Sequence, residues 1–174
     1  GPSTGTALTD FQEATVPQIA RLLRQNSPLK AGGPDGVRSA LLHTISDALA
    51  PSLCCIINNS LRSGKVPQAF KHANVTPVFK AGDPSLASNY RPISLLPVAA
   101  KVLERVVEVQ LRAYLEQHYI LPAEQFAYRR HHSASDALTL ASARWSAAQD
   151  RRERTGIVFV DMSKAFDRVL QDRK

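Results

Sequence analysis

Hydrophobic residues recur every three or four positions along most of the chain, the spacing of one face of an α-helix. Residues 9–24 fit such a helix, with Thr9 or Asp10 as its cap and Pro17 as a candidate kink. The most regular period spans residues 99–115. Its opposite face is charged, as expected of a half-buried helix, and carries Lys101, Glu104, Arg105, Glu108 and Arg112.

Three more helices follow from the same spacing. Apolar stripes lie on either side of Pro51 and predict two helices in succession, the second ending at Gly64. A further helix follows Ser133, whose hydroxyl can cap it together with Asp136 three residues later. The stripe of this last helix consists of Ala137, Leu138, Ala141, Trp145 and Ala148.

Two segments have the composition of β-strands. Residues 74–79 are rich in strand-forming residues, and Pro77 would confine them to the edge of a sheet. Residues 157–160 form a continuous apolar run that stops at Asp161, which predicts a strand buried on both faces. A carboxylate directly after such a strand is expected at the rim of the sheet, beside solvent.

Turn-forming residues separate these elements. Residues 26–36 are rich in proline and glycine, and residues 33–36 (GPDG) have the chemistry of a sharp turn. Residues 80–89 are polar and predict a second loop. The pattern as a whole predicts a mostly helical α+β protein with a few short strands.

The charge balance favours a polyanionic partner. The chain has 174 residues, 44% of them hydrophobic, and 22 Lys and Arg against 15 Asp and Glu, which gives a formal charge of +7. A basic protein attracts nucleic acid, although the same excess is also found on soluble proteins with a merely solvated surface. No stretch reaches the roughly 20 apolar residues that cross a bilayer, so we expect no membrane partner and an intracellular protein.

Two short segments concern chemistry outside the main pattern. Cys54 and Cys55 are adjacent within an apolar run, where we expect both to be buried, reduced and structural. Gly1 and Pro2 match the remnant left by a tag-removing protease, and we expect them to lie outside the fold.

Six short motifs stand out along the chain: residues 30–36 (KAGGPDG), 77–83 (PVFKAGD), 89–95 (NYRPISL), 101–105 (KVLER), 124–129 (EQFAYR) and 159–167 (FVDMSKAFD). Their order resembles that of reverse transcriptases of non-LTR (LINE-type) retrotransposons. The last of them resembles the first carboxylate motif of these enzymes, and the second and third look like their fingers hairpin. Together the matches cover the chain from about residue 30 to its end, which is more specific than any single match.

The resemblance implies a division of the chain. After the tag remnant at residues 1–2, residues 3–29 would form an N-terminal helical extension and residues 30–154 a mostly helical fingers subdomain. Residues 155–174 would begin the palm of a right-hand polymerase. The departures from the family are small. Gly32 stands where the family often has proline, and Ala127 stands where it often has glycine, which reduces the backbone freedom of that turn.

Asp161 is the candidate catalytic residue and metal ligand. Polynucleotide synthesis is phosphoryl transfer, in which two metal ions about 3.5–4 Å apart stabilise the attacking and leaving oxygens. Mg²⁺ or Mn²⁺ prefers oxygen donors, which Asp161 and the backbone carbonyl of Met162 would supply. Alternatively, a lone aspartate after a strand caps a turn or helix. By resemblance Asp167 closes the motif, and we expect it to contact a basic neighbour.

The resemblance also assigns residues to the incoming nucleotide. Lys80 and Arg91 match the positions that hold the triphosphate, and an arginine fork with a mobile lysine suits phosphate. Phe166 matches the aromatic residue that lies beneath the sugar and excludes a ribose 2′-hydroxyl. The alternatives are two solvated surface charges and a core phenylalanine.

A basic cluster precedes the last predicted helix. We interpret Arg129, Arg130, His131 and His132 as a contact with the template strand, because they lie between a turn and a helix N-terminus. The two histidines have no further ligands at zinc spacing.

Two functions from different classes remain open. The first is an RNA-directed DNA polymerase that uses template RNA, primer DNA, deoxynucleoside triphosphates and Mg²⁺, with the nucleus as the location implied by the family. No adjacent pair of aspartates occurs in the sequence, so we expect this chain to be inactive alone and to self-associate through an unpaired palm strand. The second is a non-catalytic nucleic-acid-binding module. A helical interaction domain is a third, weaker reading.

Overall fold

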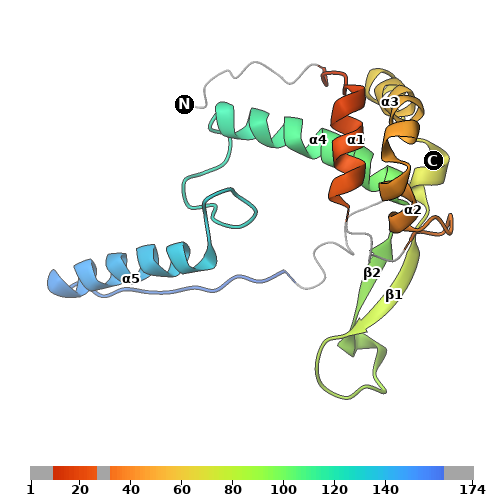
Figure 1. Cartoon of the computed structure of the whole chain (residues 1–174). Coiled ribbons are helices and arrows are strands. Elements are labelled where there is room, and N and C mark those ends of the chain that lie inside the picture. Colours follow the sequence, from red (N-terminus) through yellow and green to blue (C-terminus); the bar gives the residue numbers. More distant parts are fainter. Residues whose placement is uncertain (1–9, 27–31, 163–174) are drawn as a thin grey trace. The chain divides into compact units, whose positions relative to one another are not determined.

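The computed structural model describes residues 10–26 and 32–162 and divides into two compact units at Ile120 (Figure 1). It is a mixed structure of helices and one two-stranded antiparallel sheet, which confirms the α+β class at this level. The first unit contains α1 (Val16–Gln25), α2 (Ser39–Thr44), α3 (Ser46–Ser63), η1 (Gln68–Lys71), β1 (Asn74–Phe79), η2 (Ala87–Asn89), β2 (Tyr90–Leu95) and α4 (Val98–Gln117). The second contains α5 (Ala134–Asp150).

The core of the first unit lies where α1 packs against α3 and α4 (Figure 1). Ile19, Leu23, Ile57, Val102 and Val106 supply its centre and are at most 1% exposed. These residues recur at helical spacing on each element, so the apolar stripes predicted from the sequence are the buried faces. Among the described residues, no helix combines the length and hydrophobicity needed to cross a membrane.

Helix α1 begins later than the sequence pattern predicts. Thr15, rather than Asp10, is its N-cap, and the Thr15 hydroxyl accepts a hydrogen bond from the Gln18 N–H at 3.4 Å; Thr9 lies outside the described residues. Pro17 occupies the first turn, where its missing N–H would have had no helical partner. The proline therefore marks the start of the helix and causes no kink.

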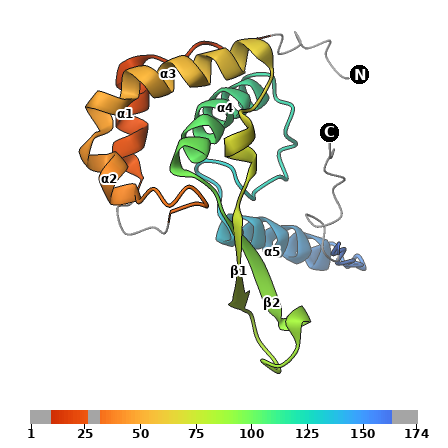
Figure 2. The same cartoon turned by 90° about the vertical axis from the view of Figure 1, so that its right-hand side faces the viewer.

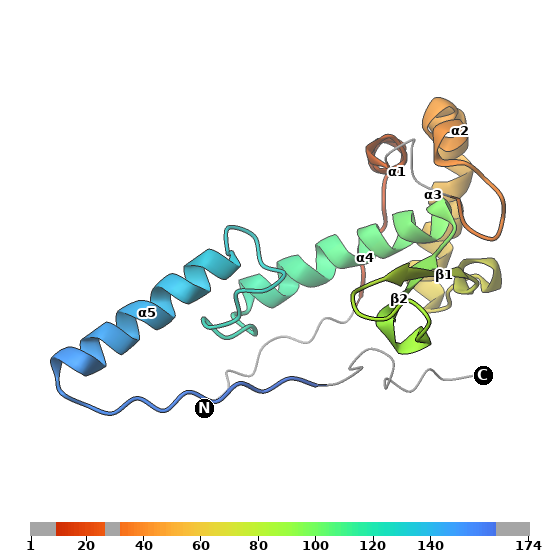
Figure 3. The same cartoon turned by 90° about the horizontal axis from the view of Figure 1, so that it is seen from below.

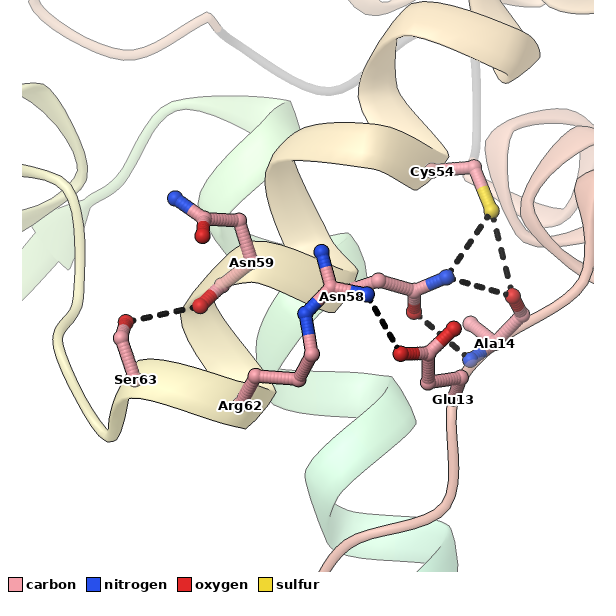
Figure 4. Close-up of polar contacts among 7 residues, drawn as sticks. All are labelled: Glu13, Ala14, Cys54, Asn58, Asn59, Arg62 and Ser63. Carbon is pink, nitrogen blue, oxygen red and sulfur yellow. Dashed lines mark hydrogen bonds and ion pairs between the residues drawn. The ribbon is translucent and has the colours of Figure 1, made fainter.

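Residues 10–15 form an extended segment that side chains of α3 and α4 hold in place. The Gln110 side-chain amide accepts from the Gln12 N–H at 2.7 Å and donates to the Gln12 carbonyl at 2.9 Å. Asn58 binds Ala14 in the same two-sided way, at 2.8 and 2.9 Å (Figure 4). Two carboxamides thus satisfy backbone groups that a neighbouring strand would satisfy in a sheet.

The sequence pattern predicted a break between two helices at Pro51. In the structure the break between α2 and α3 falls at Ile45 instead. Pro51 lies exposed in the second turn of α3, where it removes a single helical hydrogen bond and the helix continues. The predicted end is confirmed, because Gly64 is the C-cap with φ of +67°.

The two cysteines have different environments, which corrects the expectation that both are buried. Cys54 is buried, and its thiol donates to the Ala14 carbonyl at 3.2 Å (Figure 4). Cys55 is exposed, since the next residue of a helix points about 100° away from its predecessor. Both thiols are free.

Strands β1 and β2 form a hairpin that extends away from the helices of its unit (Figure 2). Its register places Pro77 opposite Pro92. The Lys80 N–H donates to the Asn89 carbonyl, so hydrogen-bonded pairs alternate from there and both prolines fall at positions whose N–H would point outward. The predicted edge character of residues 74–79 is confirmed, because a two-stranded sheet has only edges.

The turn at residues 33–36 packs beneath this hairpin. The Gly36 N–H donates to the Gly33 carbonyl at 3.1 Å, which confirms the predicted turn. A Cβ atom on Gly33 would lie 2.4 Å from the Pro97 nitrogen, at the junction of β2 and α4. A Cβ atom on Gly32 would lie 2.5 Å from the Val37 carbonyl oxygen. Both glycines therefore permit close backbone approaches that any side chain would prevent.

Helix α5 is the helix described in the second unit (Figure 3). Both of its ends are capped. The predicted capping box is confirmed: Ser133 and Asp136 bond each other's backbone N–H groups. These contacts with Ser133 hold the pKa of the Asp136 carboxyl below its ordinary value. At the other end the Glu153 N–H donates to the Ala148 carbonyl and Arg152 takes φ of +57°, a Schellman motif.

Residues 157–160 are extended but do not form the buried strand predicted from their apolar run. Their side chains are 50–91% exposed, and no β-ladder involves them within the described residues. A strand requires neighbours that pair its backbone and cover its faces, and an apolar run alone supplies neither.

Candidate functional site

Lys80 and Arg91 lie on the same face of the hairpin. Val78 pairs with Arg91 across the sheet, and side chains two residues apart on a strand share a face, so Lys80 and Arg91 are diagonal neighbours. Both side chains are exposed, and within the described residues neither contacts an acidic group. Two cations with uncompensated charge are thus held next to each other on a rigid ladder, an arrangement that suits a polyphosphate.

The loop between the strands fixes the end of the hairpin. The Asp83 carboxylate accepts from the Ser85 N–H at 2.9 Å and from the Ser85 hydroxyl at 2.7 Å, and these bonds lower the pKa of Asp83. The Asn89 side-chain amide donates to the Asp83 carbonyl at 2.8 Å. Asp83 is the only acidic residue of this loop, and its carboxylate is engaged in the hydrogen bonds that hold the turn.

The opposite face of the hairpin is apolar and exposed. Val75, Pro77, Phe79 and Pro92 are exposed on it, and the Phe79 and Tyr90 rings lie with centroids 5.4 Å apart. The hairpin is therefore two-sided, with its cations on one face and aromatic rings on the other. The sequence pattern did not predict this apolar face, although the alternation of residues 75, 77 and 79 contained the signal.

Asp161 and Met162 are exposed at the end of the extended segment, as a metal-binding carboxylate must be. Asp161 and the Met162 carbonyl offer oxygen donors, the type that Mg²⁺ prefers, and Mg²⁺ commonly takes one or two carboxylates together with water and substrate phosphates. The donor set therefore fits part of a magnesium site. Within the described residues, no group of three or more potential ligand side chains gathers around a common point.

Phe166 and Asp167 lie outside the described residues, as do Lys30 and Ala31 at the start of the first motif. Their assigned roles rest on the resemblance alone.

The basic cluster belongs to a loop, residues 121–133, in which half-buried and exposed side chains are interspersed. Phe126, Arg129 and His132 are half-buried. The Arg129 guanidinium donates to the Pro122 carbonyl at 3.1 Å, and the Phe126 and His132 rings meet edge to face at 5.5 Å. Arg130 and His131 are exposed and are thus the members of the predicted contact set that face solvent.

Two further features of this loop differ from the sequence-based expectation. The positive φ falls at Tyr128 and not at Ala127, so alanine in place of the family's glycine causes no strain there. Tyr128 is also exposed, and it directly precedes Arg129 and Arg130. This ring was not among the predicted contacts, although an aromatic residue followed by two arginines is a recognisable signal.

The first unit also contains a cavity of about 330 Å³ between α3, η1 and α4. Its apolar walls include Phe11, Leu61, Val66, Phe70, Leu103 and Val107. Neither Lys80 nor Arg91 lines it. The cationic face of the hairpin is therefore an open surface and does not belong to this cavity.

Comparison with known proteins identifies the family of this chain. Residues 78–174 match the family model for reverse transcriptase (RNA-dependent DNA polymerase). The "Probable RNA-directed DNA polymerase from transposon BS" of Drosophila melanogaster is 32% identical over 90% of this chain and 17% of its own length. The RNA-directed DNA polymerase from mobile element jockey of Drosophila funebris is 31% identical over 92% of this chain and 18% of its own. The chain thus spans less than a fifth of the length of these relatives. It belongs to the reverse transcriptase family, among the polymerases of non-LTR retrotransposons.

Proposed function

We propose that this chain supplies the nucleotide-binding hairpin and the first metal-binding carboxylate of an RNA-directed DNA polymerase from a non-LTR retrotransposon. The observation that carries the proposal is the pair of exposed cations, Lys80 and Arg91, on one face of the β1–β2 hairpin. Their register, together with the family match over residues 78–174, supports a role in binding the triphosphate of an incoming deoxynucleotide.

The two cations have different tasks in this proposal. The guanidinium of Arg91 forms paired hydrogen bonds to phosphate oxygens, which orient the triphosphate. The ammonium of Lys80 acts as a mobile point charge that neutralises the phosphates. The pinned loop at residues 81–89 keeps both on one rigid ladder, so little conformational entropy is lost when the nucleotide binds.

Asp161 and the Met162 carbonyl are the proposed metal ligands. Mg²⁺ or Mn²⁺, when bound, would neutralise charge on the transferring phosphate. Phe166 is proposed, by resemblance, to exclude ribonucleotides by bulk. Template RNA and primer DNA are the proposed nucleic-acid partners, and Arg130 is the exposed cation of the loop that would contact the template.

Nucleotide binding tests the hairpin assignment directly. Titration of a fluorescent deoxynucleoside triphosphate in the presence of Mg²⁺ should show about tenfold weaker binding for Lys80→Ala and Arg91→Ala, since each removes a charge-assisted hydrogen bond. Lys71→Ala is the matched control, because Lys71 is an exposed lysine of the same unit outside the hairpin. Equal losses in all three variants would show that only the overall charge matters, and the assignment would fail.

Primer extension tests the catalytic assignment. We propose that the 174-residue chain alone does not extend a primer, because a two-metal site needs more carboxylates than Asp161. Extension by the purified chain that disappears in Asp161→Ala would overturn this expectation and show that other carboxylates complete the site. Extension that survives in Asp161→Ala would overturn the assignment of Asp161 itself.

A non-catalytic nucleic-acid-binding module is the second candidate function, favoured by the net charge of +7. The two proposals share one requirement, which is contact with phosphates. Affinity for labelled RNA should fall steeply as salt rises, because cations bound at the backbone are released. An affinity for RNA that does not change with salt would exclude this second function and the proposed contact with the template.

A further inference from the structure

Four residues other than glycine have a positive φ within the described residues, and helix ends account for only two of them. Tyr119 and Arg152 each follow the C-cap of a helix. At Tyr119 the neighbouring Ile120 N–H donates to the Leu115 carbonyl, as in the Schellman motif that ends α5. Tyr128 and His131 lie in the loop between helices, each as the second residue of a turn, at residues 127–128 and 130–131, where glycine or asparagine is the usual residue with positive φ. A tyrosine kept at such a strained position is a candidate for a functional role.

Side-chain contacts hold the loop in this conformation. The Arg129 guanidinium donates to the Pro122 carbonyl at 3.1 Å, and the Gln125 side-chain amide donates to the Ala127 carbonyl at 3.2 Å. These two bonds lie on either side of Tyr128. The strain of its backbone, of order 1 kcal/mol or more, is thus offset by its neighbours.

The result of this arrangement is that the Tyr128 ring is turned outward. Its residue is 86% exposed, and Arg130 and His131 beside it are exposed as well. The nearest carboxylates in sequence are engaged elsewhere: Glu124 pairs with Arg144 at 3.5 Å, and Asp136 caps α5. An aromatic ring thus lies next to positive charge that no described acidic side chain neutralises.

We infer that Tyr128 is a stacking platform for an unpaired base of single-stranded nucleic acid, with Arg130 binding the adjacent phosphate. Base stacking on exposed aromatic rings, combined with nearby cations, is how proteins bind single strands without reading their sequence. A duplex would not offer the face of a base to the ring. The inference rests on the proposed function in one respect, namely that the ligand is nucleic acid.

The test separates stacking from phosphate contact. The full chain is titrated with a fluorescein-labelled 12-nucleotide oligouridylate and with the same RNA backbone lacking bases. Tyr128→Ala should weaken binding to oligouridylate about tenfold and leave binding to the abasic strand unchanged. Tyr128→Phe keeps the ring and should bind oligouridylate as the unmodified chain does. Alanine and tyrosine have similar backbone strain, so circular dichroism should show the same fold in both variants.

Tyr119 provides a matched control in the same chain. It is 90% exposed and also has a positive φ, but lies at a helix end without a flanking arginine. Tyr119→Ala should leave both affinities unchanged. An unchanged affinity of Tyr128→Ala for oligouridylate, or equal losses on both strands, would overturn the inference while the proposed function stands. Failure of the unmodified chain to bind either strand would overturn the inference together with the proposed contact with the template.

Discussion

The side-chain amide of Asn58 hydrogen-bonds both backbone groups of Ala14, accepting from the N–H at 2.8 Å and donating to the carbonyl at 2.9 Å (Figure 4). Ala14 is buried, so its N–H has no access to water as an alternative partner. The same carbonyl also accepts from the Cys54 thiol. A single asparagine of α3 thus secures the extended segment that leads into α1.

Replacing Asn58 by alanine should lower the free energy of unfolding by about 1–3 kcal/mol, because a buried N–H is left without a partner. Chemical denaturation followed by circular dichroism measures the change. Asn59→Ala is the matched control on the same helix, since Asn59 is exposed and its side chain makes no described hydrogen bond (Figure 4). That variant should be neutral or slightly stabilising through higher helix propensity. Equal destabilisation by both variants would contradict the role of Asn58.

Gly33→Ala should destabilise the first unit by about 1–3 kcal/mol, the usual cost of overpacking. The new Cβ would lie 2.4 Å from the Pro97 nitrogen and 2.7 Å from the Leu96 carbonyl carbon, which are backbone atoms that cannot turn aside. Gly156→Ala is the control, because nothing lies within 4 Å of its Cβ position. Thermal unfolding of the two variants checks this, and a stable Gly33→Ala protein would show that the turn and the hairpin base can separate.

Helical spacing and cap chemistry predicted the elements whose stability is local. The stripe of α4, the C-cap at Gly64 and the Ser133–Asp136 box all depend on residues within a few positions of one another. The start of α1 was missed because Thr15 and Pro17 together form a better first turn than Asp10. Residues 10–15 then take their conformation from Asn58 and Gln110, which are far away in sequence and give no local signal.

Only the parts of the site that depend on motifs and on strand alternation could be predicted from the sequence. The register of the hairpin places Lys80 and Arg91 on one face, and Asp161 is exposed, although the described residues form no buried strand before it; the roles assigned to these residues stay predictions. Arg129 and His132 face into their loop because one binds a carbonyl and the other packs on Phe126, contacts that charge patterns do not show. The exposure of residues 157–160 depends on which elements pair with them, which a run of apolar residues cannot specify.

The two cysteines should react with a thiol reagent at very different rates. Burial raises the pKa of the Cys54 thiol, so less of it is the reactive thiolate at pH 8, and access to its sulfur is also restricted. Cys55 is exposed. Reaction with 5,5′-dithiobis(2-nitrobenzoate) should therefore show one fast and one slow thiol in the native chain and two fast thiols in denaturant. Cys55→Ser should remove the fast phase, and a fast phase that persists in that variant would contradict the assignment.

The exposed segment at residues 157–160 should cause self-association of the chain. Four consecutive apolar residues that pair with no strand in the described part of the chain offer a template for intermolecular strand pairing. Val158 and Phe159 are 85% and 91% exposed, so Val158→Lys should introduce charge at low structural cost. Light scattering at rising concentration should show association of the unmodified chain and a marked reduction in this variant.

The hairpin is the competing route for association, and its prolines make it the weaker one. Pro77 and Pro92 remove one outward N–H from each edge of the sheet, so an added strand would lose a hydrogen bond on either side. Val75→Lys, a change of the same kind at a position that is 61% exposed on the hairpin, should therefore leave association unchanged. If Val75→Lys abolished association and Val158→Lys did not, the apolar face of the hairpin would be the contact, and the extended segment would have no part in it.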